Sequence, residues 1–252
     1  NSINGPSASI VAWNWKAGGS AVSNTNGTIN SQVSANPSAG FSIVSWVGTN
    51  TTGSVGHSLS QIPELIISKS RTVVGDWIVP TTVIDGSMDY SRLNTTDAFA
   101  TYGVTATTSS IFYTAGGAGN RGDMIAYAFH SVDGYSKVGT YGGTGSTNGP
   151  FVYCGFKPAF LILRNSGGGG EWIMQDDARQ TFNADAAYNL AANRSVEENN
   201  GTYLGGPTNA NNVDWLSNGF KIRADNGNCN AVGGTFLFIA FAESPFKHTN
   251  AH

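Results

Sequence analysis

The fold is decided by a seven-residue stretch that occurs twice, as Pro63-Glu-Leu-Ile-Ile-Ser-Lys69 and again as Pro158-Ala-Phe-Leu-Ile-Leu-Arg164. Each copy places an apolar run directly after a proline and ends on a basic residue. A Trp-Ile pair follows at the same distance from the proline in each copy, at Trp77 and at Trp172. The constant offset between the copies indicates one structural unit used twice.

Composition favours an all-β protein. Only 12% of the 252 residues are charged, against roughly 25% in ordinary soluble domains. Gly, Asn, Ser and Thr fill the gap, and because Gly and Asn tolerate positive φ, they suit short strands joined by tight turns. The net charge of -3 argues against a nucleic-acid partner. The sequence contains no run of about 18 apolar residues, so it does not predict a transmembrane helix.

Short apolar runs separated by Gly-rich turns predict the strands of both copies. In the first copy these runs are 41–47, 65–68, 76–79, 111–113 and 124–129. In the second copy they are 151–154, 160–163, 171–174, 220–222 and 236–241. The pattern predicts an all-β fold of two tandem β-sandwich modules, jelly-roll or lectin-like, that derive from an internal repeat.

The last strand of each copy has a recognisable sequence, Ala126-Tyr-Ala-Phe129 in the first and Phe238-Ile-Ala-Phe241 in the second. A third version, Ala12-Trp-Asn-Trp15, precedes any complete copy. We interpret it as the closing strand of an upstream unit, or as a strand that completes a neighbouring module. The polar stretch 18–40 that follows is interpreted as an extended linker or as an edge strand lying across the sandwich.

The predicted organisation therefore has four parts. They are residues 1–40, the N-terminal strand and extended linker; residues 41–136, the first β-module; residues 137–247, the second β-module; and residues 248–252, a C-terminal tail. Both cysteines, Cys154 and Cys229, lie in the second module. The residues leave open whether they form a disulfide or remain free thiols, because a chain of this length does not need a disulfide to fold.

Several segments, in order along the chain, carry a resemblance to one protein family. Near the N-terminus they are Trp13-Asn-Trp-Lys-Ala-Gly-Gly-Ser-Ala-Val22 and Ser34-Ala-Asn-Pro-Ser-Ala-Gly-Phe-Ser-Ile-Val-Ser-Trp46. Further along they are Gly56-His-Ser-Leu59, Gly155-Phe-Lys-Pro158, Leu216-Ser-Asn-Gly-Phe220 and Ala240-Phe-Ala-Glu-Ser-Pro-Phe246. Together they cover nearly the whole chain and resemble a module common in bacteriophage tail-fibre and virion appendage proteins. The resemblance implies an extracellular location on the virion, at the tail or the capsid surface, more than it implies any chemistry.

Members of that family often carry an aspartate and an arginine just after the second tryptophan. Asp176, Asp177 and Arg179 occupy that place here, close after Trp172, whereas the first copy has Pro80-Thr-Thr. Two carboxylates and a guanidinium can hydrogen-bond sugar hydroxyls while an indole stacks on the sugar ring. In the alternative interpretation, the arginine pairs with an aspartate to hold a loop, and Trp172 lies in the core.

Two further hypotheses concern ligands. Calcium binding by Asp176, Asp177 and Asp185 is the weaker one, since their spacing is not that of an EF-hand loop. The other concerns Trp215, which follows Asp214 and an Asn-rich stretch and is predicted to be an exposed platform for a sugar. Most of the tryptophans are predicted to pack in the core or between the modules, because each can bury about 150 to 250 Å².

Nothing in the sequence predicts catalysis. A glycosidase needs two facing carboxylates about 5 to 9.5 Å apart, whereas Glu197 and Glu198 are adjacent and diverge. The four histidines are scattered, without metal-ligand spacing or a serine partner. We therefore expect a non-enzymatic protein that needs no metal and no cofactor.

Three functions are left open. The first is a phage virion structural protein, a tail-fibre or tail-tip module that contacts the host surface, above all its glycans. The second is purely structural, a capsid decoration or a fibre spacer. The third, a polysaccharide depolymerase, is disfavoured by the lack of an acid pair. Fibres usually assemble as symmetric oligomers, so the expected partners are further copies of the chain in a homotrimer, other virion proteins, and a host-surface glycan or protein.

Overall fold

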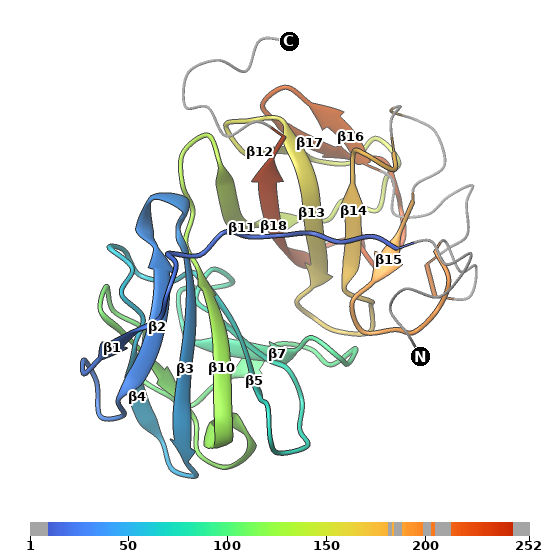
Figure 1. Ribbon diagram of the computed structural model, residues 1–252. Coiled ribbons are helices and arrows are strands. Elements are labelled where there is room, and N and C mark those ends of the chain that lie inside the picture. Colours follow the sequence, from blue (N-terminus) through green and yellow to red (C-terminus); the bar gives the residue numbers. More distant parts are fainter. Residues whose placement is uncertain (1–9, 181–182, 184–187, 199–202, 205–212, 244–252) are drawn as a thin grey trace.

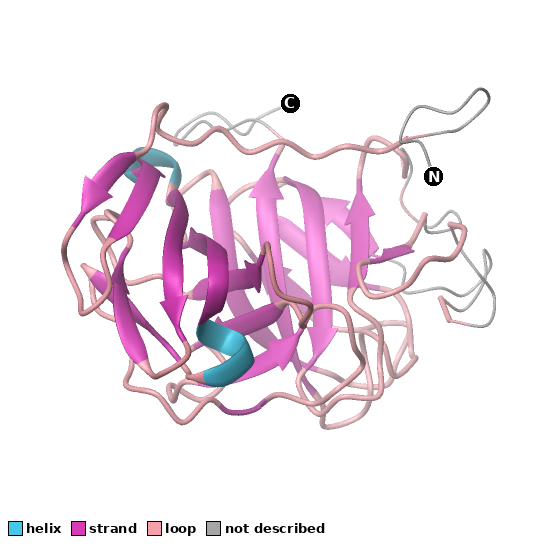
Figure 2. Cartoon of the chain, turned by 60° about the horizontal axis from the view of Figure 1, so that its bottom comes forward, coloured by secondary structure: helices cyan, strands magenta, loops and turns pink. Residues whose placement is uncertain are grey.

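The computed structural model describes residues 10–180, 183, 188–198, 203–204 and 213–243, and antiparallel strands dominate it (Figure 1 and Figure 2). The helical elements of these residues are two short 3-10 turns, Pro37–Ala39 and Gly117–Asn120. The prediction of an all-β fold is therefore confirmed. Within the same residues, no helix is long and apolar enough to cross a membrane.

The first module is an eight-stranded sheet packed on a two-stranded sheet. The order of the large sheet is β1-β2-β3-β10-β5-β6-β7-β8. Its strands are Val22–Asn24 (β1), Ser31–Asn36 (β2), Phe41–Thr49 (β3), Arg121–Phe129 (β10), Leu65–Ser70 (β5), Ile78–Thr81 (β6), Asp89–Arg92 (β7) and Ala100–Thr101 (β8). The small sheet pairs Gly53–Gly56 (β4) with Ile111–Thr114 (β9). Apolar side chains from both sheets, such as Val44, Val55 and Phe112, form the first core.

The second module is a five-stranded sheet packed on a three-stranded sheet. The large sheet has the order β11-β18-β13-β14-β15, and its strands are Ser136–Gly142 (β11), Thr235–Ala242 (β18), Pro158–Asn165 (β13), Ile173–Asp176 (β14) and Leu190–Ala191 (β15). The small sheet has the order β12-β17-β16, with strands Phe151–Tyr153 (β12), Gly219–Ile222 (β17) and Val213–Leu216 (β16). Leu161, Phe220 and Phe236 lie in the core between the two sheets.

The two large sheets connect their strands in the same way. In the first module β3 pairs with the closing strand β10, which pairs with β5, and β6 and β7 follow. In the second module β11 pairs with the closing strand β18, which pairs with β13, and β14 and β15 follow. The two repeated sequence stretches thus occupy equivalent strands, β5 and β13. An equal strand order is what a repeated unit predicts, and its origin by duplication stays a prediction.

The modules pack together through the outer faces of their large sheets. Neighbouring residues on a strand point to opposite faces: Ile66 lies in the first core, whereas Leu65 lies in a cluster shared with the second module. In the same way Leu161 belongs to the second core and Phe160 to the shared cluster. The layers therefore follow in the order small sheet, large sheet, large sheet, small sheet.

A loop of the first module, residues 92–99, reaches over the second module. Its backbone is bonded to the hairpin after β13, since the Phe99 N–H donates to the Ser166 carbonyl and the Gly169 N–H donates to the Thr96 carbonyl, both at 2.9 Å. The ring of Phe99 also packs on Trp172, with ring centres 6.0 Å apart. These contacts fix the position of one module relative to the other.

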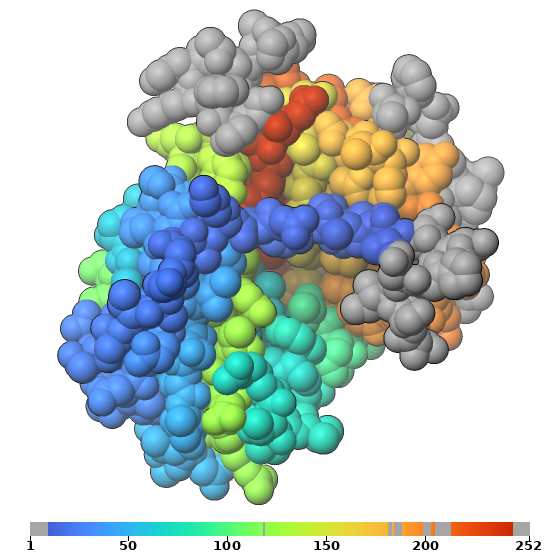
Figure 3. All heavy atoms as spheres, in the orientation of Figure 1, coloured from blue at the N-terminus to red at the C-terminus, as the bar shows by residue number. Residues whose placement is uncertain are grey.

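Residues 10–18 cross the front of the molecule as an extended segment, and Figure 3 shows it lying in the crease between the modules. Trp13 packs on Phe160 with ring centres 4.8 Å apart, and Trp15 packs on Phe129 and Phe241. The segment pairs with no sheet of the described residues, so the prediction of a closing strand at residues 12–15 is wrong. Trp13 and Trp15 pack against the cluster between the modules and belong to no sheet of the described residues.

The boundary placed at residue 41 is also wrong. Residues 18–40 contain β1 and β2, and β2 pairs with β3 over its whole length. Alternate residues of β2, Ser31 and Val33, are buried, which explains why a polar stretch still forms a strand. The first module therefore begins at β1, as in the edge-strand interpretation of this stretch.

Candidate functional site

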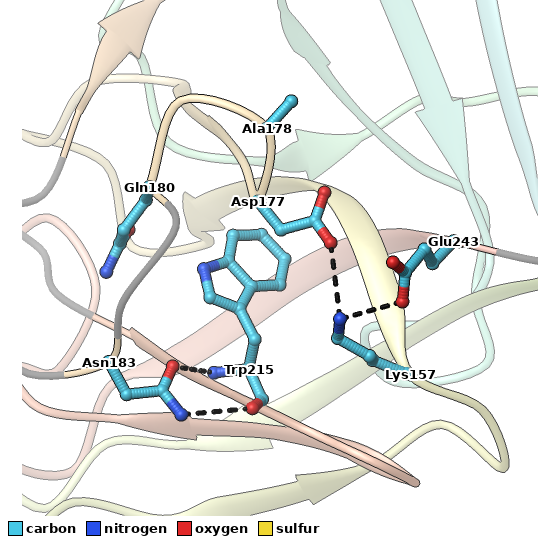
Figure 4. Close-up of a pocket in the computed structure, with 7 residues that line it drawn as sticks. All are labelled: Lys157, Asp177, Ala178, Gln180, Asn183, Trp215 and Glu243. Atoms are coloured by element: carbon cyan, nitrogen blue, oxygen red, sulfur yellow. Dashed lines mark hydrogen bonds and ion pairs between the residues drawn. The ribbon is translucent and has the colours of Figure 1, made fainter. Parts of the chain in front are cut away.

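A pocket of about 530 Å³ lies beside the large sheet of the second module (Figure 4). We call it the Trp215 pocket, and it is lined by Lys157, Asp177, Ala178, Gln180, Asn183, Trp215 and Glu243. Sequence analysis predicts two of these residues, Asp177 and Trp215, as separate candidates from different segments. The structure brings them together in one site.

Strand ends position most of these side chains. Lys157 precedes β13, Asp177 and Gln180 follow β14, and Glu243 follows β18. Because β14 and β18 both pair antiparallel with β13, their C-terminal ends lie beside the start of β13. Backbone bonds hold this end of the sheet together: the Asp177 N–H donates to the Ala159 carbonyl at 3.0 Å, and the Glu243 N–H donates to the Lys157 carbonyl at 3.1 Å.

One wall of the pocket is a charged cluster. The ammonium of Lys157 lies 2.7 Å from a carboxylate oxygen of Glu243 and 3.6 Å from one of Asp177. The hydrogen bond to Glu243 raises the pKa of Lys157, so the lysine stays charged. Burial raises the pKa of the Asp177 carboxyl, and Lys157 opposes that rise. Two carboxylates thus face one ammonium, and the wall is negative on balance when both are ionised.

Trp215 forms the inner wall, and only 7% of its surface is exposed. Asn183 holds its backbone, because the Asn183 side-chain oxygen accepts from the Trp215 N–H at 2.8 Å and the Asn183 amide donates to the Trp215 carbonyl at 3.1 Å. The prediction of an exposed platform is wrong, since most of the indole packs in the second core. Figure 4 shows the indole between Gln180 on one side and Asp177 with Lys157 on the other.

Two polar atoms of the pocket residues are buried without a hydrogen-bond partner in the described part of the chain. They are Nε1 of Trp215 and Oε1 of Gln180. Gln180 is itself 2% exposed, and its amide Nε2 donates to the Val213 carbonyl at 3.2 Å, which fixes the orientation of the amide. Buried polar atoms in native structures are nearly always paired with protein, water or ligand, so both atoms call for an explanation.

Asp176 and Arg179 hold the loop after β14 and do not line the pocket. The Asp176 carboxylate accepts from the Arg179 N–H at 3.0 Å and from its Nε at 2.7 Å. Arg179 also contacts the Glu198 carboxylate, and its guanidinium lies 5.9 Å from the ring centre of Trp13. This arrangement matches the alternative in which the arginine pins a loop. The loop in turn carries three residues of the pocket, Asp177, Ala178 and Gln180.

Trp172 lies away from the pocket, in the interface between the modules. It is 1% exposed, and its Nε1 donates to the Arg92 carbonyl of the first module at 2.9 Å. A sugar could reach its ring only if the modules separated. The prediction that Trp172 binds a ligand is therefore wrong, and the core alternative describes its position.

Neither of the remaining sequence hypotheses leads to a reactive centre. No group of three His, Cys, Asp or Glu side chains that could hold a metal ion occurs in the described ranges, and Asp185 lies outside them. Cys154 and Cys229 are both buried and are not joined by a disulfide, which decides the alternative left open above. Burial raises the pKa of Cys154 to about 12 and also raises that of Cys229. Thiols with raised pKa values stay protonated at neutral pH and react slowly.

Sequence analysis does not predict Lys157, Gln180, Asn183 or Glu243 as site residues. A signal for two of them is present, because Lys157 and Glu243 lie in two of the segments that carry the family resemblance. Their approach to each other depends on the pairing of β13 with β18, which neither segment encodes alone. The two amide residues carry no local signal in a chain so rich in polar side chains.

Fold and pocket together define an all-β protein of two packed sandwich modules, with a polar pocket on the second. The chain belongs to the family described as Domain of unknown function (DUF7483), whose model matches residues 1–245. No curated protein and no solved structure matches the chain. The matched range includes both modules, the extended N-terminal segment and every residue of the Trp215 pocket.

Proposed function

We propose that this protein is a non-enzymatic structural protein of a phage virion, a tail-fibre or tail-tip module, and that its Trp215 pocket binds a glycan of the host surface. The observation that supports glycan binding is the pocket itself. It combines an indole, a fixed amide and two carboxylates on a rigid β scaffold. Such a set supplies planar polar groups for sugar hydroxyls beside the small exposed part of an indole.

The virion location is supported by the resemblance of the sequence segments, and two features of the structure are consistent with it. The modules are joined through a large aromatic cluster and a hydrogen-bonded loop, as a part under mechanical load requires. The sheet of the first module also ends in the edge strand β1, where Val22 is 62% exposed. An exposed edge strand is a natural place for contact with further copies or with other virion proteins.

The test is binding of the purified chain to a glycan array and to host cells, with Gln180→Ala as the site variant. Gln32→Ala, an exposed glutamine in β2 of the first module, is the matched control. We expect Gln180→Ala to lower binding about tenfold and Gln32→Ala to leave it unchanged. Equal binding by both variants, or no binding of the native chain to any glycan, would refute the glycan function.

A second candidate is a spacer in which the two modules only set a length. The inter-module interface is the observation that favours it, since it would keep the modules from bending. Absence of binding to both glycans and cells, together with incorporation into particles, would establish this alternative. Release of reducing sugar from host polysaccharide would instead point to a depolymerase. Sedimentation of the chain tests the expected homotrimer.

A further inference from the structure

Two side chains that line the Trp215 pocket each carry one polar atom that is buried and has no hydrogen-bond partner among the described residues. The donor is the indole N–H of Trp215, and the acceptor is the amide oxygen of Gln180. Both side chains are more than nine-tenths buried, so bulk water does not compensate them freely. Neither is free to rotate toward another partner, because the Trp215 indole packs in the second core and the Gln180 amide donates to the Val213 carbonyl. A bound group that satisfies both would recover the free energy lost on their burial.

The chemistry of that group follows from the pair. A carboxylate accepts hydrogen bonds but has no proton to donate to the Gln180 oxygen, and an ammonium donates but cannot accept from the indole. A hydroxyl or a secondary amide does both. The charged wall disfavours an acidic sugar, since Lys157 is already engaged by Glu243 and Asp177 and offers no free cation.

We infer that the Trp215 pocket takes an uncharged sugar unit, held through a hydroxyl or an acetamido group that accepts a hydrogen bond from Trp215 Nε1 and donates one to Gln180 Oε1. This inference rests on the proposed glycan function and names the sugar class for it. The pocket volume of about 530 Å³ leaves room for more than one sugar ring beside the buried pair.

The experiment compares four monosaccharides on the full chain by ligand-detected NMR. They are glucose, N-acetylglucosamine, glucosamine and glucuronic acid. We expect one of the two neutral sugars to bind at least tenfold more tightly than either charged sugar. Preference for N-acetylglucosamine over glucose assigns the acetamido group, and the reverse assigns a hydroxyl. Binding of glucosamine or glucuronic acid as tightly as the neutral sugars would overturn the inference.

Trp215→Phe tests the donor, because it keeps an aromatic ring in the core and removes the pyrrole part of the indole with its N–H. Trp46→Phe is the matched control, since Trp46 is also buried but its Nε1 donates to Asn120 at 2.7 Å, far from the pocket. We expect Trp215→Phe to weaken the neutral sugar about tenfold and Trp46→Phe to leave its affinity unchanged. Loss of affinity in both variants, or in neither, would refute the role of the indole N–H.

A readout without sugar separates this inference from the proposed function. If Trp215 Nε1 is unpaired, its removal should lower the urea midpoint less than removal of the paired Nε1 of Trp46, which strands the Asn120 oxygen. If no sugar binds, the glycan function fails, and the midpoints still report whether the donor is free. A larger loss for Trp215→Phe than for Trp46→Phe would show that the donor is already satisfied and would remove the basis of the inference.

Discussion

Both modules contain the same arrangement of a basic residue, a glycine carbonyl and a tryptophan, which we call the corner of the module. A loop covers the corner of the second module, whereas the corner of the first module is open. In the first, Lys69 on β5 donates to the Gly75 carbonyl at 2.6 Å and lies 5.5 Å from the ring centre of Trp77. In the second, Arg164 on β13 donates to the Gly170 carbonyl and lies 5.4 Å from the ring centre of Trp172.

The agreement extends to the backbone. The Trp77 N–H donates to the side chain of Asn94 at 2.9 Å, and the Trp172 N–H donates to that of Asn193 at 3.0 Å. Each asparagine also donates to the acidic residue just before the tryptophan, Asp76 in the first module and Glu171 in the second. Cation, glycine, indole and asparagine thus form one unit of side-chain and backbone bonds in both modules.

The two corners differ in whether a loop packs over them. The loop 92–99 covers the second corner, where the Arg92 carbonyl accepts from Trp172 and the Asp97 carbonyl accepts from Arg164. Trp77 is only partly buried, and Val74 on the equivalent hairpin is fully exposed. The hairpins explain the difference, because Gly168 leaves room for the loop where the first module has Val73. A Cβ at Gly168 would lie 2.5 Å from the Ala98 nitrogen. The same local unit therefore holds a hairpin in both modules, and Gly168 allows the loop 92–99 to pack against the second one.

The largest effect is expected for Trp172→Ala, measured by urea unfolding. It removes a side chain that is 1% exposed and leaves the Arg92 carbonyl without its donor, which should cost about 3 to 5 kcal/mol of unfolding free energy. Trp77→Ala is the matched control, and because Trp77 is partly exposed its cost should be about 1 kcal/mol. Equal costs would show that the cover of the second corner contributes nothing.

A smaller loss is expected for Gly168→Val, which installs the residue of the first module. Gly168 has φ +80°, and the added side chain would collide with Ala98, so about 2 kcal/mol or more should be lost and the loop 92–99 displaced. Hydrogen exchange at the Phe99 amide, which is bonded to Ser166, reports the displacement. Val73→Gly is the control and should cost about 0.5 to 1 kcal/mol through chain entropy alone. Unchanged exchange at Phe99 in Gly168→Val would break the proposed explanation.

Features that depend on local sequence can be predicted from the sequence, and features that depend on distant contacts cannot. The proline-led stretches and the closing strands predict the all-β fold and the central strands of both large sheets. They do so because the apolar pattern that marks a strand lies within the strand's own residues. The pairing of Arg179 with Asp176 is local as well, and the sequence predicts it as one of two alternatives. By contrast, the burial of Trp172 depends on a loop more than seventy residues away in the chain, and the Lys157–Glu243 pair depends on strand pairing. The strand prediction at Trp13 is wrong for a related reason: every second side chain of this segment is partly buried, as in a strand, although the segment pairs with no sheet of the described residues.

The two cores differ in their expected response to acid. His57 lies fully buried in the first module, where its Nδ1 accepts from the Leu59 N–H at 3.1 Å, whereas residues 137–243 contain no histidine. Burial lowers the pKa of His57 below 6.5, with His130 adding to this and the bond to Thr108 opposing it. The unfolded chain therefore binds the proton first, and stability should fall as the pH drops through 6.5.

Urea unfolding between pH 7.5 and 5.5 measures this response, with His57→Gln as the comparison variant. The native chain should lose stability over that range, by less than Gly168→Val loses at pH 7. His57→Gln should show a flatter dependence, because the titrating group is gone. An equally steep dependence in the variant would assign the acid response to another group.

The smallest effect is expected for Lys69→Arg, which gives the open corner the cation of the covered one. An arginine can donate to the Gly75 carbonyl and lie over Trp77 as Arg164 does over Trp172, so the unfolding free energy should change by less than about 0.5 kcal/mol. Lys69→Met is the control that removes both contacts, and at this partly exposed site it should cost about 0.5 to 1 kcal/mol. If Lys69→Arg costs as much as Lys69→Met, the two corners are not interchangeable. They would then share a geometry without making the same contribution to the unfolding free energy.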